Sequence, residues 1–272
     1  MSQTQTIGAA VVVETMERLR NWAFERERDI EIQDFFDAAV LDGDWRPLAE
    51  RYRALLDGHR GRIGLHGPFW GFDVATPDPM VAEVVRTRLG QGLDVCAAVG
   101  ADQMVIHSPF TTWDAHNLDK DPGARERMIE TVLANLAHVA RRAEDAGVTL
   151  VIENIEDRDP AERRRLAEAF GSAAVRLSLD TGHAQYAHVA TGAPPVDYFV
   201  TDAGPLLEHV HLQDADGYAD RHWAVGEGTI RWAAVMAALA PLEQRPRLIL
   251  ELRDHGRIVE SAERLEGVAA AG

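Results

Sequence analysis

Short apolar runs alternate with longer amphipathic stretches along the whole chain. Six of these runs are clear, two nearer the start are weaker, and each is four to seven residues long. Runs that are almost continuously apolar are typical of parallel strands buried on both faces. We therefore predict eight strands, at Ile7–Val13, Asp29–Gln33, Arg62–His66, Gln103–His107, Thr149–Glu153, Val175–Asp180, Leu207–Leu212 and Leu248–Glu251.

The stretches between these runs are predicted to form helices. Asp78 and Pro79 supply an N-cap followed by a proline in the first turn, and the apolar residues from Met80 to Leu89 recur at helical spacing. Residues 130–146 place their apolar side chains on one face and stop before Gly147, which is a suitable C-cap. Residues 161–170 and 231–240 also have a helical pattern.

Strand–helix alternation without an interruption predicts parallel βα units. Eight such units in about 250 residues describe a (β/α)8 TIM barrel of the α/β class. The chain has no low-complexity tract and no linker, so we expect residues 1–272 to form a single TIM-barrel domain. A doubly wound sheet is the competing fold, which periodicity alone does not exclude.

Ionisable side chains stand at or beside the C-terminal ends of six runs. They are His66, His107, Glu153, Asp180 with His183, His211, and Glu251 with Arg253. In a TIM barrel these positions converge on one mouth, where catalytic residues lie. Several carboxylates in one cavity, with no lysine nearby, need a cation to neutralise them. Oxygen and imidazole ligands without thiolate suit Mn, Mg, Co, Fe or Zn, so we predict a divalent metal ion there.

Residues next to these positions supply further candidates. His209 and His211 point to the same side of one strand. His211 is nearer the strand end and is the better ligand, whereas His209 belongs to the core or supports a ligand. The loop after this run carries Asp220 and His222, which could reach the same metal site. Trp70, after the third run, could stack on the apolar face of a sugar.

Composition narrows the range of functions. The 272 residues carry a formal net charge of −16, from 28 basic and 44 acidic residues, which argues against nucleic-acid binding. No apolar run approaches the roughly 20 residues of a membrane helix. Lys120 is the only lysine and Cys96 the only cysteine, which disfavours a Schiff-base lysine and a thiolate metal site. We expect a cytoplasmic protein, and the sequence is compatible with a homo-oligomer.

The chain resembles the xylose isomerase-like TIM-barrel superfamily of sugar isomerases, epimerases and endonuclease IV from about Arg62 to Arg253. The resemblance rests on motifs that occur in this order: His66-Gly67-Pro68, Val105-Ile106-His107, Glu153-Asn154, Asp180-Thr181-Gly182-His183, Val210–Asp214, Gly226–Gly228 and Leu250–Arg253. In ketose 3-epimerases and hydroxypyruvate isomerases of this superfamily, four residues hold one divalent metal. They match Glu153, Asp180, His211 and Glu251, and His183 matches a histidine near the substrate or metal.

The resemblance implies a metal-dependent isomerase or epimerase that acts on a small sugar, ketose or polyol through an enediolate. Glu153 and Glu251 would be its acid–base pair, since the matching glutamates have that role in the superfamily. The groups that would bind substrate are His66, His107, His183, Trp70 and Arg253.

The resemblance to endonuclease IV implies a rival function, that of a multinuclear zinc phosphodiesterase. That enzyme holds three zinc ions through nine ligands, which match His66, His107, Glu153, Asp180, His183, His211, Asp220, His222 and Glu251. The acidic surface and the lack of a basic loop for phosphates weaken this alternative. A dehydratase of a cyclic polyol would use much the same residues, and a sugar-binding barrel without turnover is a third class. The sequence does not specify the sugar or the metal.

Overall fold

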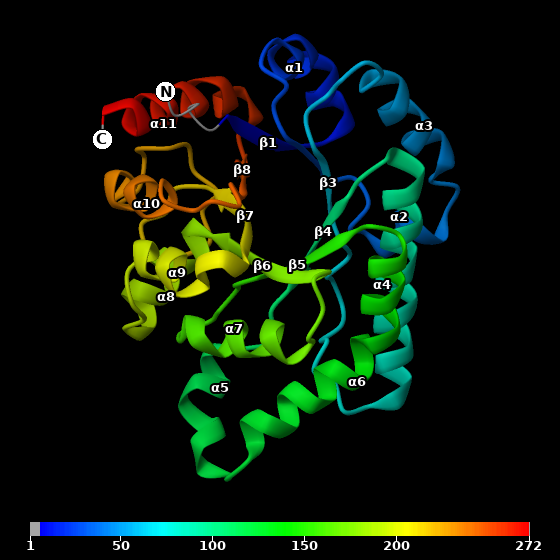
Figure 1. Cartoon of the computed structure of the whole chain (residues 1–272), viewed down its shortest axis with the longest axis vertical. Coiled ribbons are helices and arrows are strands. Elements are labelled where there is room, and N and C mark those ends of the chain that lie inside the picture. The colour runs from blue at the N-terminus through cyan, green and yellow to red at the C-terminus, as the bar shows by residue number, and fades with distance from the viewer. Residues whose placement is uncertain (1–5, 272) are drawn as a thin grey trace.

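Eight parallel strands close into a barrel in the order of the chain, β1 to β8, and the helices surround it (Figure 1). The structure is a computed structural model, and it describes residues 6–271. The strands are β1 Ile7–Val11, β2 Ile30–Ile32, β3 Ile63–His66, β4 Gln103–His107, β5 Thr149–Glu153, β6 Val175–Asp180, β7 Leu207–Leu212 and β8 Arg247–Leu250. The predicted (β/α)8 TIM barrel is confirmed, and the doubly wound alternative is wrong because β8 pairs with β1.

The helices follow the strands as the alternation predicts. They are α1 Val13–Glu25, α2 Ala38–Asp42, α3 Arg46–Leu55, α4 Pro79–Val99, α5 Thr112–Asn117, α6 Ala124–Asp145, α7 Pro160–Ala169, α8 Thr181–Thr191, α9 Val196–Ala203, α10 Trp232–Leu239 and α11 Ile258–Ala271. Short 3-10 turns are η1 Leu118–Lys120, η2 Gly204–Leu206 and η3 His255–Arg257. The Asp78 side chain accepts from Met80 N and caps α4, as predicted.

Several predicted boundaries are wrong by a few residues. The first strand ends at Val11 and not at Val13, because the carbonyl of Val12 accepts from Thr15 N and Met16 N and so starts α1. The second strand is one residue shorter at each end than predicted, and the third begins one residue later than predicted. The eighth strand is shifted back by one residue, to Arg247–Leu250. Helix α6 begins at Ala124 rather than residue 130, and the chain turns at Gly147, whose φ of 68° suits glycine.

The core is made of the strands and the inner faces of the helices. Leu65, Val151, Leu179 and Val210 are fully buried in four of the strands. Such burial on both faces is what nearly continuous apolar runs predict. That residues 1–272 form one domain stays a prediction, since residues 1–5 and 272 lie outside the described part.

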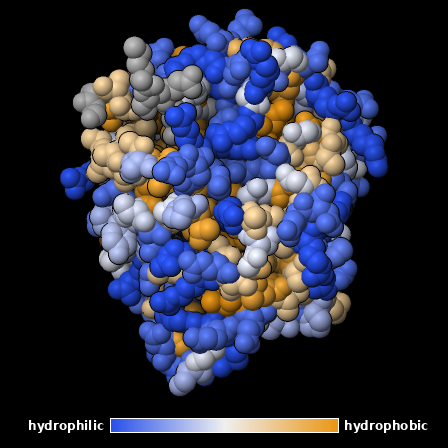
Figure 2. Space-filling view, in the orientation of Figure 1, coloured by the Kyte–Doolittle hydropathy of each residue, from blue (hydrophilic) through white to orange (hydrophobic). Residues whose placement is uncertain are grey.

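The face that Figure 2 shows is largely polar. Hydrophilic residues cover most of it, and apolar residues are visible mainly in its middle and lower part. Among the helices that the structure describes, none is long and apolar enough to cross a membrane.

Candidate metal centre

The C-terminal ends of the strands carry the side chains that the sequence singled out. His66, His107, Glu153 and Asp180 are the last residues of β3 to β6, His211 precedes the last residue of β7, and Glu251 follows β8. Barrel closure brings these ends together around a cavity of about 400 Å³. Its lining includes His66, His107, Glu153, His183, Asp220, His222 and Glu251. Asp180 and His211 are completely buried beside these residues.

Glu153, Asp180, His211 and Glu251 form the first ligand group. Each offers one ligand atom, and these four atoms lie within 4.8 Å of one another. Nδ1 of His211 is 2.9 Å from Oε1 of Glu153 and 3.5 Å from Oε2 of Glu251. Three carboxylates and one imidazole at this separation make a donor set that divalent metals accept.

His66, His107 and Glu153 form the second ligand group. Nε2 of His66 lies 3.7 Å and Nε2 of His107 lies 3.6 Å from Oε2 of Glu153. Within residues 6–271, this buried oxygen has no hydrogen-bond partner. A buried carboxylate oxygen is costly without a partner, and these distances are too long for good hydrogen bonds. A cation between the three atoms would remove the cost, so the residues present fit a metal ion.

His183, Asp220 and His222 form the third ligand group. Nε2 of His183 lies 3.4 Å from Oδ1 of Asp220, and Nε2 of His222 lies 3.0 Å from Oδ2. The third group borders the first, because Nδ1 of His183 is 3.7 Å from both Glu153 Oε1 and Asp180 Oδ1. All nine residues named for the multinuclear alternative therefore lie in three adjoining groups, and Glu153 belongs to two of them.

Backbone carbonyls orient three of these histidines. Each pairs its Nδ1 with a main-chain oxygen: His66 with Gly67 (3.0 Å), His183 with Asn154 (2.9 Å) and His222 with Glu251 (3.0 Å). A carbonyl can only accept, so Nδ1 carries the proton in the neutral ring and Nε2 keeps its lone pair for a metal. Metal-binding histidines commonly have such a partner on the other nitrogen.

For the ionisable groups of this site, burial and neighbouring groups of opposite charge shift the pKa values in opposite directions. Burial raises the pKa of Asp180 to about 6, although His183 opposes this, and burial lowers the pKa of His107 to about 3. Burial would also lower the pKa of His222, but its hydrogen bond with Asp220 and the nearby carboxylates raise it to about 9. Similarly, burial alone would raise the pKa of Glu153, yet the charge and hydrogen bond of His211 hold it well below its usual range.

Three polar residues of the site escaped the sequence analysis. Gln33 follows β2 and donates from Nε2 to Oε1 of Glu251. Gln213 follows β7 and donates to Oδ1 of Asp220 (2.9 Å) and Oδ1 of Asp180 (3.2 Å), so it links the first and third groups. Glu31 interrupts the apolar strand β2 between two isoleucines. A buried carboxylate needs a partner, and that signal was available in the sequence.

The aromatic and arginine candidates lie apart from the ligand groups. Trp70 is 64% exposed and stands edge-on to Phe36, with ring centroids 5.2 Å apart. Arg253 is exposed, and its backbone N–H donates to the carbonyl of His222. Neither lines the cavity, whereas Phe69 does and stacks on His107 at 4.2 Å. Substrate binding by Trp70 and Arg253 stays a prediction.

The chain belongs to the xylose isomerase-like TIM barrel family, whose model matches residues 28–270. A structure of the TTHB071 protein from Thermus thermophilus, soaked with ZnCl2, is 28% identical, has a TM-score of 0.76, and the match covers 98% of this chain and 99% of that one.

Other proteins match at lower identity. A D-tagatose 3-epimerase-like protein is 19% identical, with a TM-score of 0.79 and coverage of 97% of this chain and 98% of that chain. In sequence, an uncharacterised Methanocaldococcus jannaschii protein, MJ1311, is 21% identical over 220 residues, which are 78% of this chain and 71% of that protein.

Proposed function

We propose that the protein is a divalent-metal-dependent enzyme that isomerises or epimerises a small sugar, ketose or polyol. The observation that carries this proposal is the first ligand group. Glu153 and Glu251 both belong to this group, and both line the cavity. The D-tagatose 3-epimerase-like neighbour supports the choice of substrate class. Imidazole-rich surroundings favour Mn, Co, Fe or Zn over Mg, and the zinc-soaked relative is in keeping with this.

The proposed chemistry is a proton transfer next to a carbonyl. A divalent ion held by the first ligand group would polarise the carbonyl and the adjacent hydroxyl oxygen. Glu153 or Glu251 removes the proton from the neighbouring carbon and leaves an enediolate. The other glutamate returns a proton, to the opposite face for epimerisation or to the adjacent carbon for isomerisation. Gln33 fixes the Glu251 carboxyl by donating to its Oε1.

Substrate hydroxyls have several partners in the cavity. His66, His107 and His183 line it together with the two glutamates. Phe69 adds an apolar face beside His107. A cavity of about 400 Å³ lies in the range of small-molecule sites, which start at about 300 Å³. These features suit a single sugar ring or a short open-chain ketose.

The decisive test is proton exchange in deuterated water. Metal-loaded protein is incubated with a panel of ketoses, and deuterium at each carbon is followed by NMR. We expect exchange at the carbon next to the carbonyl, and loss of at least about 100-fold in Glu153→Gln and in Glu251→Gln, in line with the usual contribution of a general base. Glu156→Gln is the matched control, because this exposed glutamate lies three residues beyond Glu153 and outside the ligand groups.

Full exchange activity in both glutamine variants would contradict the proposed roles. Exchange followed by loss of water would identify a dehydratase of a polyol. Binding of a sugar without any exchange would identify a barrel that lacks turnover.

A second candidate function is a multinuclear zinc phosphodiesterase. It is favoured by one observation, the presence of the second and third ligand groups beside the first. Neighbouring metal ions can stabilise both the attacking and the leaving oxygen of a phosphate ester. The net charge of −16 disfavours a nucleic-acid substrate, so a small phosphodiester is the better candidate.

Metal counting separates the two functions. The isomerase requires one ion per chain at the first group, whereas the phosphodiesterase requires two or three. The same zinc-loaded sample is tested on bis(p-nitrophenyl) phosphate and on an abasic oligonucleotide. Cleavage that disappears in His107→Gln and His222→Gln, without any ketose exchange, would replace the first proposal with the second.

A further inference from the structure

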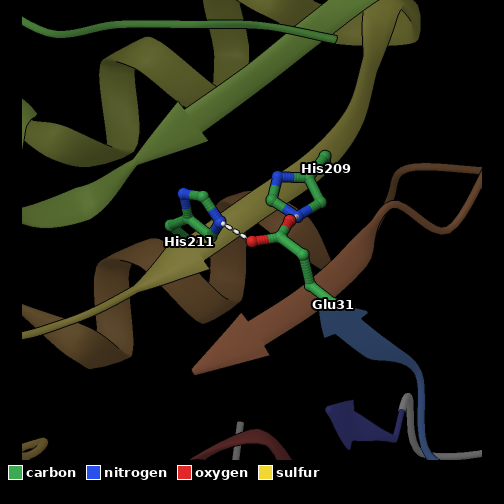
Figure 3. Close-up of side chains that lie close together, drawn as sticks. All are labelled: Glu31, His209 and His211. Atoms are coloured by element: carbon green, nitrogen blue, oxygen red, sulfur yellow. Dashed lines mark hydrogen bonds and ion pairs between the residues drawn. The ribbon is translucent and has the colours of Figure 1, made fainter. Parts of the chain in front are cut away.

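Glu31 occupies the interior of the barrel in a layer of small neighbours. It lies in the middle of β2, pairs in register with Ala10 of β1 and Gly64 of β3, and is only 2% exposed. A Cβ on Gly64 would stand 3.9 Å from Cγ of Glu31. These small residues leave the barrel interior open for the carboxylate, which points toward β7 and lies between the rings of two histidines (Figure 3).

The Glu31 carboxylate contacts both histidines of β7. Its Oε1 is hydrogen-bonded to Nε2 of His211 at 2.9 Å, the contact dashed in Figure 3. Its Oε2 lies 3.0 Å from Nε2 of His209, and Nδ1 of His209 pairs with Oγ of Ser178 at 2.8 Å. All four side chains are buried. Hydrogen bonds therefore join Ser178 of β6 to His209 and Glu31 to His211, whereas Nε2 of His209 is close to Glu31 without a hydrogen bond among residues 6–271.

Both ring nitrogens of His211 face a carboxylate oxygen at 2.9 Å: Nε2 faces Glu31, and Nδ1 faces Glu153. A carboxylate only accepts hydrogen bonds, so without a metal both nitrogens carry a proton. A metal held by the first ligand group would replace the proton on Nδ1, whereas the proton on Nε2 would stay with Glu31. Nδ1 is the atom that lies 2.9 Å from Glu153 and 3.5 Å from Glu251, on the side of the first ligand group.

The Glu31 cluster is better explained as a support than as an ion site. Glu31, His209 and His211 each offer a ligand atom, and these atoms lie within 4.8 Å of one another. However, Oε1 of Glu31 already has a hydrogen-bond partner in Nε2 of His211, and all three side chains are almost completely buried. Glu31 and His209 lie outside the lining of the cavity, whereas Glu153 and Glu251 of the first group belong to it.

We propose that Glu31 is a positioning residue that holds His211 with Nε2 protonated and with Nδ1 directed at the first ligand group. The inference rests on the proposed metal site. In His66, His183 and His222, the ring nitrogen is held by a backbone carbonyl, which a side-chain substitution cannot remove. In His211, Nε2 is held by the Glu31 side chain, so substituting Glu31 tests this contact directly.

The test measures zinc binding at His211 itself. Protein labelled with 15N in its histidine rings is titrated with ZnCl2, and the two His211 nitrogens are followed by NMR. In the wild-type protein we expect Nδ1 to respond to zinc while Nε2 keeps its proton. Partners of metal-binding histidines typically contribute about 10–100-fold in affinity. We expect a loss of about tenfold in Glu31→Gln, which keeps an acceptor but no charge, and up to about 100-fold in Glu31→Ala.

Asp29→Asn is the matched control. Asp29 is a buried carboxylate two residues before Glu31, and it accepts from Arg62 Nε at 3.0 Å, away from the ligand groups. Its loss affects stability but leaves the zinc affinity at His211 unchanged. Glu31→Gln decides the question if Glu31→Ala does not fold.

Two results would overturn the inference. One is zinc affinity in Glu31→Gln within twofold of the wild-type value, and the other is coordination through Nε2. If instead zinc, manganese and cobalt all leave the His211 resonances of the wild-type protein unmoved, the proposed metal site itself fails.

Discussion

At the scale of single residues, the ligand groups balance carboxylates against imidazoles. Burial would lower the pKa of His183 and of His211, but the neighbouring carboxylates raise both well above the usual value. Without a metal, imidazolium rings therefore supply the positive charge that the buried carboxylates need. Because a metal ligand must give up its proton, metal binding at this site releases protons and competes with them.

This charge balance predicts that the metal-free protein loses stability as the pH rises. The pKa of His222 is raised from 6.5 to about 9 in the folded protein. Its stabilising contribution is thus fully present below pH 6.5 and is lost as the pH rises through about 9. The upper limit is about 3 kcal/mol, since one pKa unit corresponds to about 1.4 kcal/mol.

The measurement is chemical unfolding of EDTA-treated protein at pH 6.5 and at pH 9.5. His222→Gln should show a smaller difference between the two pH values than the wild-type protein. His188→Gln, on the outer helix α8, is the control and should leave the difference unchanged. An equal loss of stability in wild type and His222→Gln would refute the assignment.

At the scale of elements, the segment after β7 brings Asp220 and His222 to the mouth. Asp214 anchors it: Oδ2 accepts from Gly226 N (2.7 Å) and Trp232 Nε1 (2.9 Å), and Oδ1 accepts from Ile230 N (3.3 Å). The backbones of Asp214 and Trp223 also exchange two hydrogen bonds, of 2.9 and 3.1 Å. A completely buried aspartate thereby ties both ends of the segment to the barrel.

Asp214→Ala should therefore weaken the fold and the third ligand group together. Each buried donor left unsatisfied costs about 1–3 kcal/mol, so we expect a loss of about 2–4 kcal/mol in unfolding free energy. We also expect weaker metal binding at His183, Asp220 and His222. The measurements are urea unfolding and zinc titration. Asp216→Ala is the control, since Asp216 lies in the same segment, pairs with Arg221 near the surface, and should change stability far less.

At the scale of the whole molecule, the ligand groups connect strands that are far apart in the chain. The first group alone joins residues at or next to the C-terminal ends of β5, β6, β7 and β8. A metal ion bound there would cross-link half of the barrel. It would bind the folded chain and not the unfolded one, so it would stabilise the fold by mass action.

Metal removal should lower the melting temperature. At a free ion concentration of about 100 times Kd, binding adds about 2.7 kcal/mol, which corresponds to about 5–10 °C for a chain of this size. Differential scanning calorimetry with zinc and with EDTA measures the shift, and adding excess zinc should reverse it. A combined variant removes all four ligands of the first group: Glu153→Gln, Asp180→Asn, His211→Gln and Glu251→Gln. In this variant, metal at the first group should no longer raise the melting temperature. A melting temperature that is independent of metal in the wild-type protein would count against a metal centre.

Local pattern alone was enough for most of the fold and for the main ligand candidates. Four of the predicted strands, including Thr149–Glu153 and Val175–Asp180, match the observed bounds. A strand that is buried on both faces is apolar at nearly every position, so it can be recognised in the sequence. The C-terminal ends of parallel strands must also lie on the same face of the barrel. His66, His107, Glu153, Asp180, His211 and Glu251 could therefore be identified without coordinates.

The grouping of these residues depended on tertiary structure. Distances between side chains depend on the stagger of the closed barrel and on the path of each loop, and neither leaves a local trace in the sequence. Three features appear only when strands far apart in sequence become neighbours. They are the division into three ligand groups, the Oε2 of Glu153 that has no hydrogen-bond partner in the described part of the chain, and the contact of Glu31 with His211. The sequence by itself determined which side chains reach the mouth, and the closed barrel decided which of them meet.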